Sequence, residues 1–130
     1  MTNFGLRKPD IGKMKKEDFV KRTMSFGLRV IRLVNSLPKQ QVAPVLGRQL
    51  LRAGTSVGAN YRAAVRGKSR ADFIAKMGIV EEECDEALYW MEMLIESQLV
   101  KPDLLRDLVD EANQILSIVV ASIRTARRNK

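Results

Sequence analysis

Residues 50–70 read LLRAGTSVGANYRAAVRGKSR, a segment that has many small side chains and no acidic residue. Gly54 and Gly58 lie four residues apart inside a helix-like pattern. A glycine in a helix interior costs about 1 kcal/mol relative to alanine, so a helix with two of them should gain close packing in return. We therefore predict that a neighbouring helix approaches this one closely at the two glycines.

Apolar residues recur at intervals of three and four in four segments of the chain, which is the spacing of amphipathic helices. No strand-like alternation is present, and the connections between the segments are short. The sequence therefore predicts an all-α, antiparallel up-and-down four-helix bundle. The predicted core positions are Phe19, Thr23, Phe26, Val30, Leu33 and Leu37; Leu46, Leu50, Ala53, Val57, Tyr61 and Ala64; Phe73, Met77, Val80, Cys84, Ala87, Met91 and Leu94; and Leu104, Leu108, Glu111 or Ala112, Ile115, Val119 and Ser122 or Ile123.

Prolines, a glycine and a serine mark the ends of the predicted helices. Pro38 should end the first helix, Pro44 is tolerated in the first turn of the second, and Ser69 should cap the third. The expected helices run from Lys16 to about Leu37, from 41–44 to Gly67, from Ser69 through Leu94, and from Lys101 to about Ala126. Residues 1–15 are expected to be a flexible or loosely docked arm, which leaves 16–130 as one bundle domain.

Composition excludes several functional classes. The chain of 130 residues contains no histidine, the commonest metal ligand and general base. Its single cysteine, Cys84, lies on an apolar position and fits a reducing compartment. The acidic run 81–86 has no calcium or magnesium loop spacing, and no apolar run reaches the roughly 18 residues of a membrane helix. We predict a cytoplasmic protein without cofactor, metal site or membrane partner.

Basic residues are concentrated in the first half of the chain. Residues 1–70 hold sixteen Lys/Arg and three Asp/Glu, whereas residues 71–100 hold one Lys and eight acids. Either the acidic third helix neutralises its basic neighbours, or the basic residues form a surface for nucleic acid or for another subunit. Few aromatic residues are present, which favours contacts to phosphates over base stacking. The candidate nucleic-acid-binding residues are Arg22, Arg29, Arg48, Arg62, Arg66, Lys68, Arg70, Arg124, Arg127 and Arg128.

A row of polar residues follows one side of the second predicted helix. An antiparallel neighbour would bring this row close to glutamates of the third helix, and we expect a hydrogen-bonded layer inside the bundle that fixes helix register. The alternative is a small-molecule site that works by Arg/Glu electrostatics. We prefer the structural interpretation because polar layers in bundles usually specify structure. The residues of this predicted polar layer are Arg52, Ser56, Asn60, Glu83, Glu86 and Trp90.

The chain has more apolar residues than one internal face needs. This surplus predicts a second buried face and hence an oligomer, although a single bundle with wide apolar stripes would also account for it. The surplus residues are Leu28, Ile31, Leu51, Ile74, Ile79, Leu88, Ile95, Leu105 and Ile118.

Residues 48–62, RQLLRAGTSVGANYR, resemble the signature of a four-helix-bundle family named after proteins encoded in intervening sequences of bacterial 23S ribosomal RNA genes. Asp85-Glu86 with Tyr89-Trp90, Lys101-Pro102 and Ala121-Ser122-Ile123 resemble its later motifs, and the resemblance runs from about residue 18 to residue 127. Ala63 departs from the pattern, because relatives usually carry glutamate there.

This resemblance implies a homopentameric barrel of bundles without known catalytic activity. Related proteins include accessory variability determinants of diversity-generating retroelements, which bind nucleic acid and a reverse transcriptase. We therefore predict a non-enzymatic, oligomeric protein that binds nucleic acid, with RNA preferred, or acts as a scaffold. The second hypothesis is a protein-interaction adaptor, for example a reverse-transcriptase accessory protein. The third hypothesis is a small-molecule enzyme that uses Arg52 and Glu83.

Overall fold

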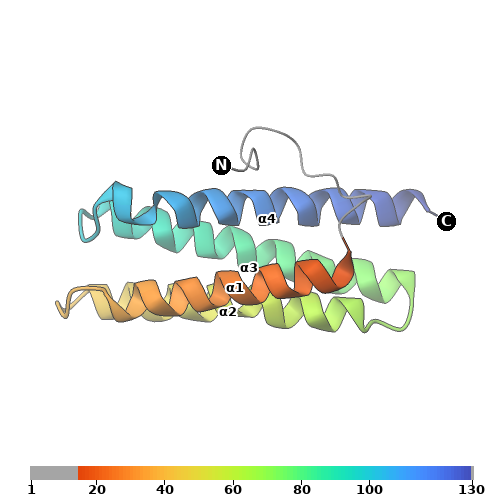
Figure 1. Cartoon of the computed structure of the whole chain (residues 1–130), viewed down its shortest axis with the longest axis horizontal. Helices are drawn as coiled ribbons and strands as arrows, with labels where there is room; N and C mark the ends of the chain where they lie inside the picture. Colours follow the sequence, from red (N-terminus) through yellow and green to blue (C-terminus); the bar gives the residue numbers. More distant parts are fainter. Residues whose placement is uncertain (1–14, 130) are drawn as a thin grey trace.

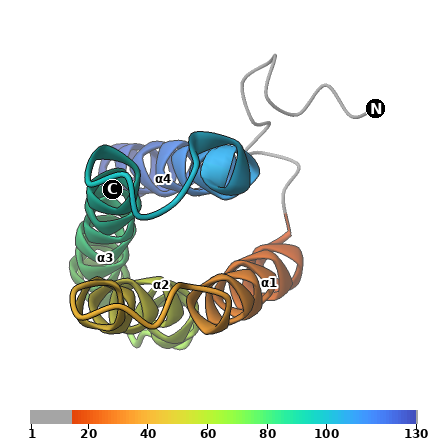
Figure 2. The same cartoon turned by 90° about the vertical axis from the view of Figure 1, so that its left-hand side faces the viewer.

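The computed structural model describes residues 15–129, which form four α-helices and no strand. The helices are α1 (Lys16–Asn35), α2 (Ala43–Val65), α3 (Arg70–Glu96) and α4 (Pro102–Arg128). They run alternately in opposite directions (Figure 1), and the end-on view shows them in chain order around a common core (Figure 2). The predicted all-α four-helix bundle is confirmed. Most of the predicted N-terminal arm, and Lys130, lie outside the described residues.

The helix ends follow the local chemistry of the chain. The hydroxyl of Ser69 accepts a hydrogen bond from the Asp72 backbone N–H at 3.0 Å, so the predicted cap of α3 is confirmed. Helix α1 ends at Asn35, two residues before the predicted end, because Pro38 disfavours a helical conformation at Leu37. Gln98, directly after the C-cap of α3, has a positive φ of 65°.

The predicted core positions of α1, α2 and α3 are buried, except that Phe73 is only partly buried. Thr23 is the buried polar residue among them, and its hydroxyl donates to the carbonyl oxygens of Phe19 and Val20, each at 3.1 Å. A threonine is therefore accommodated in the core without an unsatisfied hydroxyl.

The core face of α4 was predicted in part incorrectly. Leu104 is 62% exposed, whereas Leu105 is fully buried and Ile118 is 2% exposed. Leu104 and Leu105 precede Leu108 by four and by three residues, and both spacings fit a helix, so the sequence did not separate them. Packing against the other helices selects Leu105. Of the remaining surplus, Leu28, Ile31 and Ile79 are exposed, and Leu51, Ile74, Leu88 and Ile95 are partly buried.

Close contact between α1 and α2 depends on the glycines of α2. A Cβ atom added at Gly54 would lie 2.8 Å from Val30 Cγ2, and one added at Gly58 would lie 3.3 Å from the Thr23 backbone. Gly47 is similarly close to Leu37. The close approach predicted from residues 50–70 is therefore confirmed, and the neighbour is α1.

Candidate nucleic-acid interface

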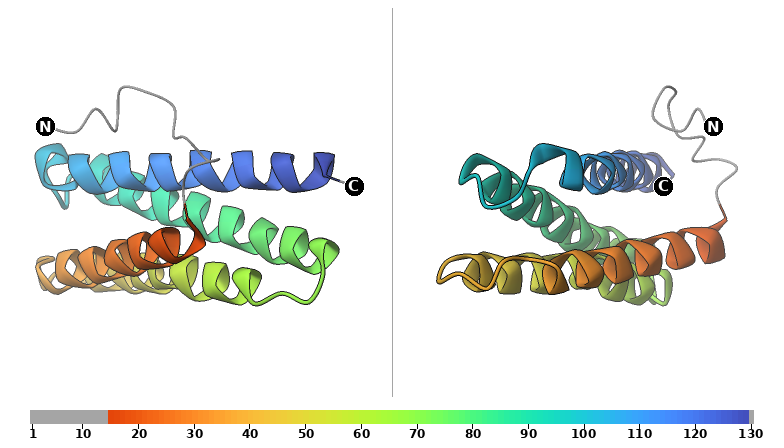
Figure 3. Two further views of the ribbon diagram at one scale, coloured as in Figure 1. Left: turned by 45° about the vertical axis from the view of Figure 1, so that its right-hand side comes forward. Right: turned by 60° about the vertical axis from the view of Figure 1, so that its left-hand side comes forward.

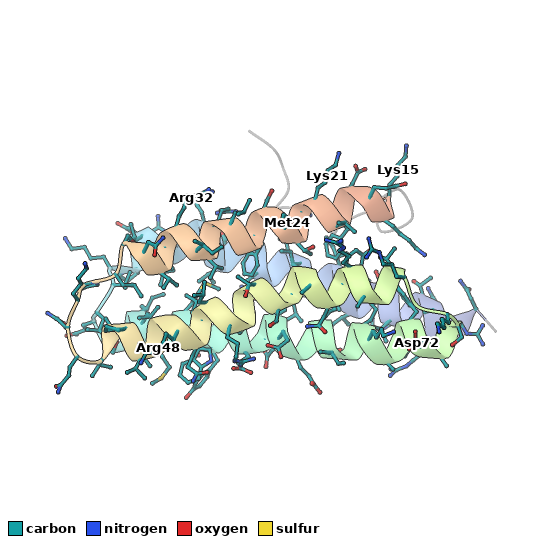
Figure 4. The ribbon with its side chains drawn as sticks, turned by 90° about the horizontal axis from the view of Figure 1, so that it is seen from below. Lys15, Lys21, Met24, Arg32, Arg48 and Asp72 are labelled. Atoms are coloured by element: carbon teal, nitrogen blue, oxygen red, sulfur yellow. The ribbon has the colours of Figure 1, made fainter. Side chains whose placement is uncertain are left out.

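Three basic segments that are far apart in the sequence meet at one end of the bundle. The start of α1, the α2–α3 connection and the end of α4 lie together in the views of Figures 1 and 3. In Figure 4, Lys15 and Asp72 lie toward this end, and Arg32 and Arg48 lie toward the other. We call this region the basic end. Its exposed cations are Lys15, Lys16, Arg62, Arg66, Lys68, Arg70, Arg124, Arg127 and Arg128.

The charges of the basic end are not neutralised by ion pairs. Within residues 15–129, none of these nine side chains has a carboxylate oxygen within 4 Å. The nearby Asp72 carboxylate instead accepts hydrogen bonds from Lys76 Nζ at 2.8 Å and from the Lys68 backbone N–H at 3.1 Å. These two bonds hold the pKa of Asp72 below its ordinary value, and the bond from Lys76 has the larger effect. The exposed cations therefore remain available for anionic ligands.

Three of the predicted nucleic-acid-binding residues lie elsewhere, and one of them is engaged. Arg22 donates from Nε and Nη2 to the two carboxylate oxygens of Glu111, both at 2.8 Å, and from Nη2 to Gln114 Oε1 at 3.1 Å. Its side chain is only 14% exposed. Arg22 therefore lies outside the basic end, contrary to the prediction, and connects α1 to α4. Arg29 is partly buried on α1, and Arg48 is exposed near the opposite end.

The predicted polar layer forms only in part. Arg52 Nη1 lies 3.2 Å from Glu83 Oε1, Arg52 Nη2 pairs with Glu86, and Trp90 Nε1 donates to Glu86 Oε2 at 3.1 Å. The bond from Trp90, followed by that from Arg52, lowers the pKa of Glu86 below its ordinary value. Together these four residues connect α2 to α3.

Ser56 and Asn60 do not join this network. Both side chains donate to carbonyl oxygens of their own helix. Ser56 Oγ donates to the Arg52 carbonyl oxygen at 2.7 Å, and Asn60 Nδ2 donates to the Ser56 carbonyl oxygen at 2.8 Å. The Arg52 side chain is 51% exposed, so the network lies on the outside of the α2–α3 contact. The prediction that this layer lies inside the bundle is therefore wrong. Ala53 and Val57 fill the interior face of α2, and adjacent helical residues point about 100° apart. At the surface, the Arg52 guanidinium is paired with two carboxylates, those of Glu83 and Glu86.

Between residues 15 and 129 no cluster of His, Cys, Asp and Glu is suited to a metal ion. The thiol of Cys84 is buried against the carbonyl oxygen of Ala112 at 3.3 Å, and burial raises its pKa to about 12. None of the described helices has the length and apolarity required to cross a membrane.

Two comparisons place the chain among known proteins. The family model described as 23S rRNA-intervening sequence protein matches residues 15–121. This chain belongs to that family. The resemblance inferred from residues 48–62 is therefore confirmed.

A solved relative supports the family assignment at the level of structure. The crystal structure of a protein of unknown function from the S23 ribosomal protein family of Bacteroides thetaiotaomicron is similar with a TM-score of 0.79. It is 32% identical in sequence, and the match covers 85% of this chain and 99% of that one. No curated protein matches the chain.

Proposed function

We propose that this protein binds structured RNA through the basic end, as a non-enzymatic oligomer or scaffold. The observation that carries the proposal is the gathering of exposed cations, without carboxylate partners among the described residues, from three separate segments of the bundle. Lysine and arginine contacts to phosphates release counterions and supply most of the affinity of sequence-independent binding.

Recognition of RNA shape and backbone fits this surface better than recognition of exposed bases. At the basic end Tyr61 is buried and Phe73 is partly buried, so the described part of this end offers one partly accessible ring and no row of aromatic side chains on which successive bases could stack. Double-stranded RNA is recognised mainly through its phosphates and 2′-hydroxyls. A structured RNA is therefore the ligand that we expect.

The test compares two triple variants with the same change in charge. Arg62→Glu/Arg66→Glu/Arg70→Glu alters the basic end. Arg32→Glu/Lys39→Glu/Arg48→Glu alters exposed residues toward the other end, where Arg32 and Arg48 lie in Figure 4 and where the α1–α2 connection that contains Lys39 lies in Figure 1. Binding of a labelled hairpin RNA is measured by fluorescence anisotropy over a salt series. We expect the first variant to bind about tenfold or more weakly than the wild type. The slope of log affinity against log salt concentration should become shallower by about three units. The second variant should bind nearly as the wild type does. Equal losses in both variants, or no binding of wild type at low salt, would reject the proposal.

Assembly of several copies is part of the same proposal. Met24, Leu28 and Ile31 form an exposed apolar patch on α1, which supports contact with another subunit. The family resemblance implies five copies. Native mass spectrometry should give five times the 14.7 kDa of one chain, and Leu28→Lys/Ile31→Lys should shift the mass toward that of one chain. A single-chain mass for the wild type would reject the pentamer.

An adaptor that binds a basic protein is the second candidate. It is favoured by a groove of about 470 Å³ between α3 and α4, which is lined by Glu81, Glu82 and Asp85 together with Leu116 and Val120. The partner would be another subunit or a basic protein, such as the reverse transcriptase that the resemblance implies. Glu82→Lys/Asp85→Lys should change the oligomer mass in light scattering if this groove contacts another subunit. An unchanged mass would count against that form of the candidate.

A further inference from the structure

A cavity of about 470 Å³ opens at the basic end, where the start of α1, the α2–α3 connection and the end of α4 surround it. This volume lies within the range of about 300–1,000 Å³ typical of small-molecule sites. The cavity is open to solvent along its mouth, and its volume is sufficient for a small ligand to lie in it.

The lining of the cavity favours an anion. Lys16, Lys68 and Arg70 contribute three cations from two separate segments, and Ser122 and Thr125 add hydroxyl groups from α4. No aspartate or glutamate is among the described lining residues.

One wall of the cavity is apolar and includes an aromatic ring. Phe73 is partly buried there beside Ala64 and Val65, and Lys16 Nζ lies 5.6 Å from the centroid of the Phe73 ring. The site therefore offers cations for a phosphate and an apolar wall for a flat ring. A nucleotide combines these two groups.

We propose that this cavity binds a nucleotide that carries a terminal phosphomonoester, with the phosphate at Lys16, Lys68 and Arg70. A phosphomonoester carries between one and a half and two negative charges at pH 7, as in phosphorylated side chains, whereas an internal phosphodiester carries one. The three cations of the lining suit the more highly charged group. The nucleotide is either the phosphorylated end of an RNA strand, in which case the inference rests on the proposed function, or a free mononucleotide.

The test uses the full chain and one RNA prepared with a 5′-phosphate or a 5′-hydroxyl. We expect the phosphorylated RNA to bind about tenfold more tightly, because the terminal dianion gains charge-assisted hydrogen bonds. Lys16→Ala should remove this preference, so that the two RNAs bind equally; because Lys16 also belongs to the basic end, both affinities should fall, and the ratio between them is the measurement that decides. Lys15→Ala is the matched control, since Lys15 is exposed next to Lys16 but does not line the cavity.

A separate titration with 5′-AMP distinguishes the two sources of the nucleotide. A preference for phosphorylated RNA assigns the cavity to the end of a strand, and binding of 5′-AMP that Lys16→Ala abolishes assigns it to a free nucleotide. Equal binding of the two RNAs together with no binding of 5′-AMP would overturn the inference, even if RNA binding itself is retained. Binding of 5′-AMP without any binding of RNA would sink the proposed function and leave this inference standing.

Discussion

At the scale of single residues, Gly54 sets the distance between α1 and α2. Gly54→Ala should lower the free energy of unfolding by about 1 kcal/mol, because the new Cβ would lie 2.8 Å from Val30 Cγ2. Overpacking of this kind costs about 1–3 kcal/mol, which exceeds the gain of about 1 kcal/mol in helix propensity.

Gly78 provides the control for this prediction within α3. A Cβ added at Gly78 meets no atom within 4 Å, so Gly78→Ala should raise the free energy of unfolding by about 0.5–1 kcal/mol. Urea denaturation of both variants measures the two changes. If Gly54→Ala stabilised the protein as much as Gly78→Ala does, the close approach of α1 and α2 would not explain this glycine.

Cys84 predicts a specific loss of stability at alkaline pH. Burial raises the pKa of its thiol to about 12 from an ordinary value of 9.0. The buried neutral thiol therefore contributes fully to the free energy of unfolding below pH 9. This contribution is lost as the pH rises from about 9 toward about 12. Between pH 8 and pH 10, the free energy of unfolding measured by urea denaturation should fall by about 1 kcal/mol more for the wild type than for Cys84→Ala. Parallel pH profiles for the two proteins would contradict this expectation.

At the scale of helices, the pair Arg22–Glu111 connects α1 to α4. Among neighbouring helices, α1 and α4 share the smallest contact. Arg22→Met should lower the free energy of unfolding by about 2–3 kcal/mol, because it leaves the Glu111 carboxylate, only 15% exposed, without its guanidinium.

A matched change at Arg52 separates a buried ion pair from an exposed one. Arg52 also pairs with glutamates on another helix, but its side chain is 51% exposed. Arg52→Met should therefore lower the free energy of unfolding by less than about 1 kcal/mol. The double variant Arg22→Met/Glu111→Met should recover part of the loss. Similar costs for Arg22→Met and Arg52→Met in urea denaturation would show that burial does not set the strength of the α1–α4 connection.

The same helices show how far the sequence alone predicts this fold. Periodicity identified all four helices and nearly the whole core of α1, α2 and α3, because burial follows directly from spacing along a helix. It misplaced Leu104 and Leu105, where both choices fit the period. The partner of Arg22 was also missed, since it depends on the register of α1 against α4, and these two helices lie far apart in the sequence.

At the scale of the whole molecule, the candidate site arises from topology. The basic residues near positions 16, 66 and 127 are visible in the sequence as separate groups. Four antiparallel helices place the start of the first, the second connection and the end of the fourth at one end, which brings these groups together (Figures 1 and 3). Spacing along single helices did not predict this gathering. It also did not predict that Arg22 is engaged within the bundle while Arg62 and Arg66 are exposed.

Arg70 offers a final test of whether the basic end serves binding or stability. It is the first residue of α3, where a cation opposes the positive end of the helix dipole. Arg70→Glu should therefore raise the free energy of unfolding by about 0.5 kcal/mol and weaken RNA binding at the same time. Lys101→Glu makes the same charge change at the N-cap of α4, toward the opposite end of the bundle, and should stabilise without altering RNA affinity. Urea denaturation and anisotropy on both variants measure the two effects. Because stability alone would favour an acid at position 70, a destabilised Arg70→Glu protein would mean that the arginine is retained for the fold.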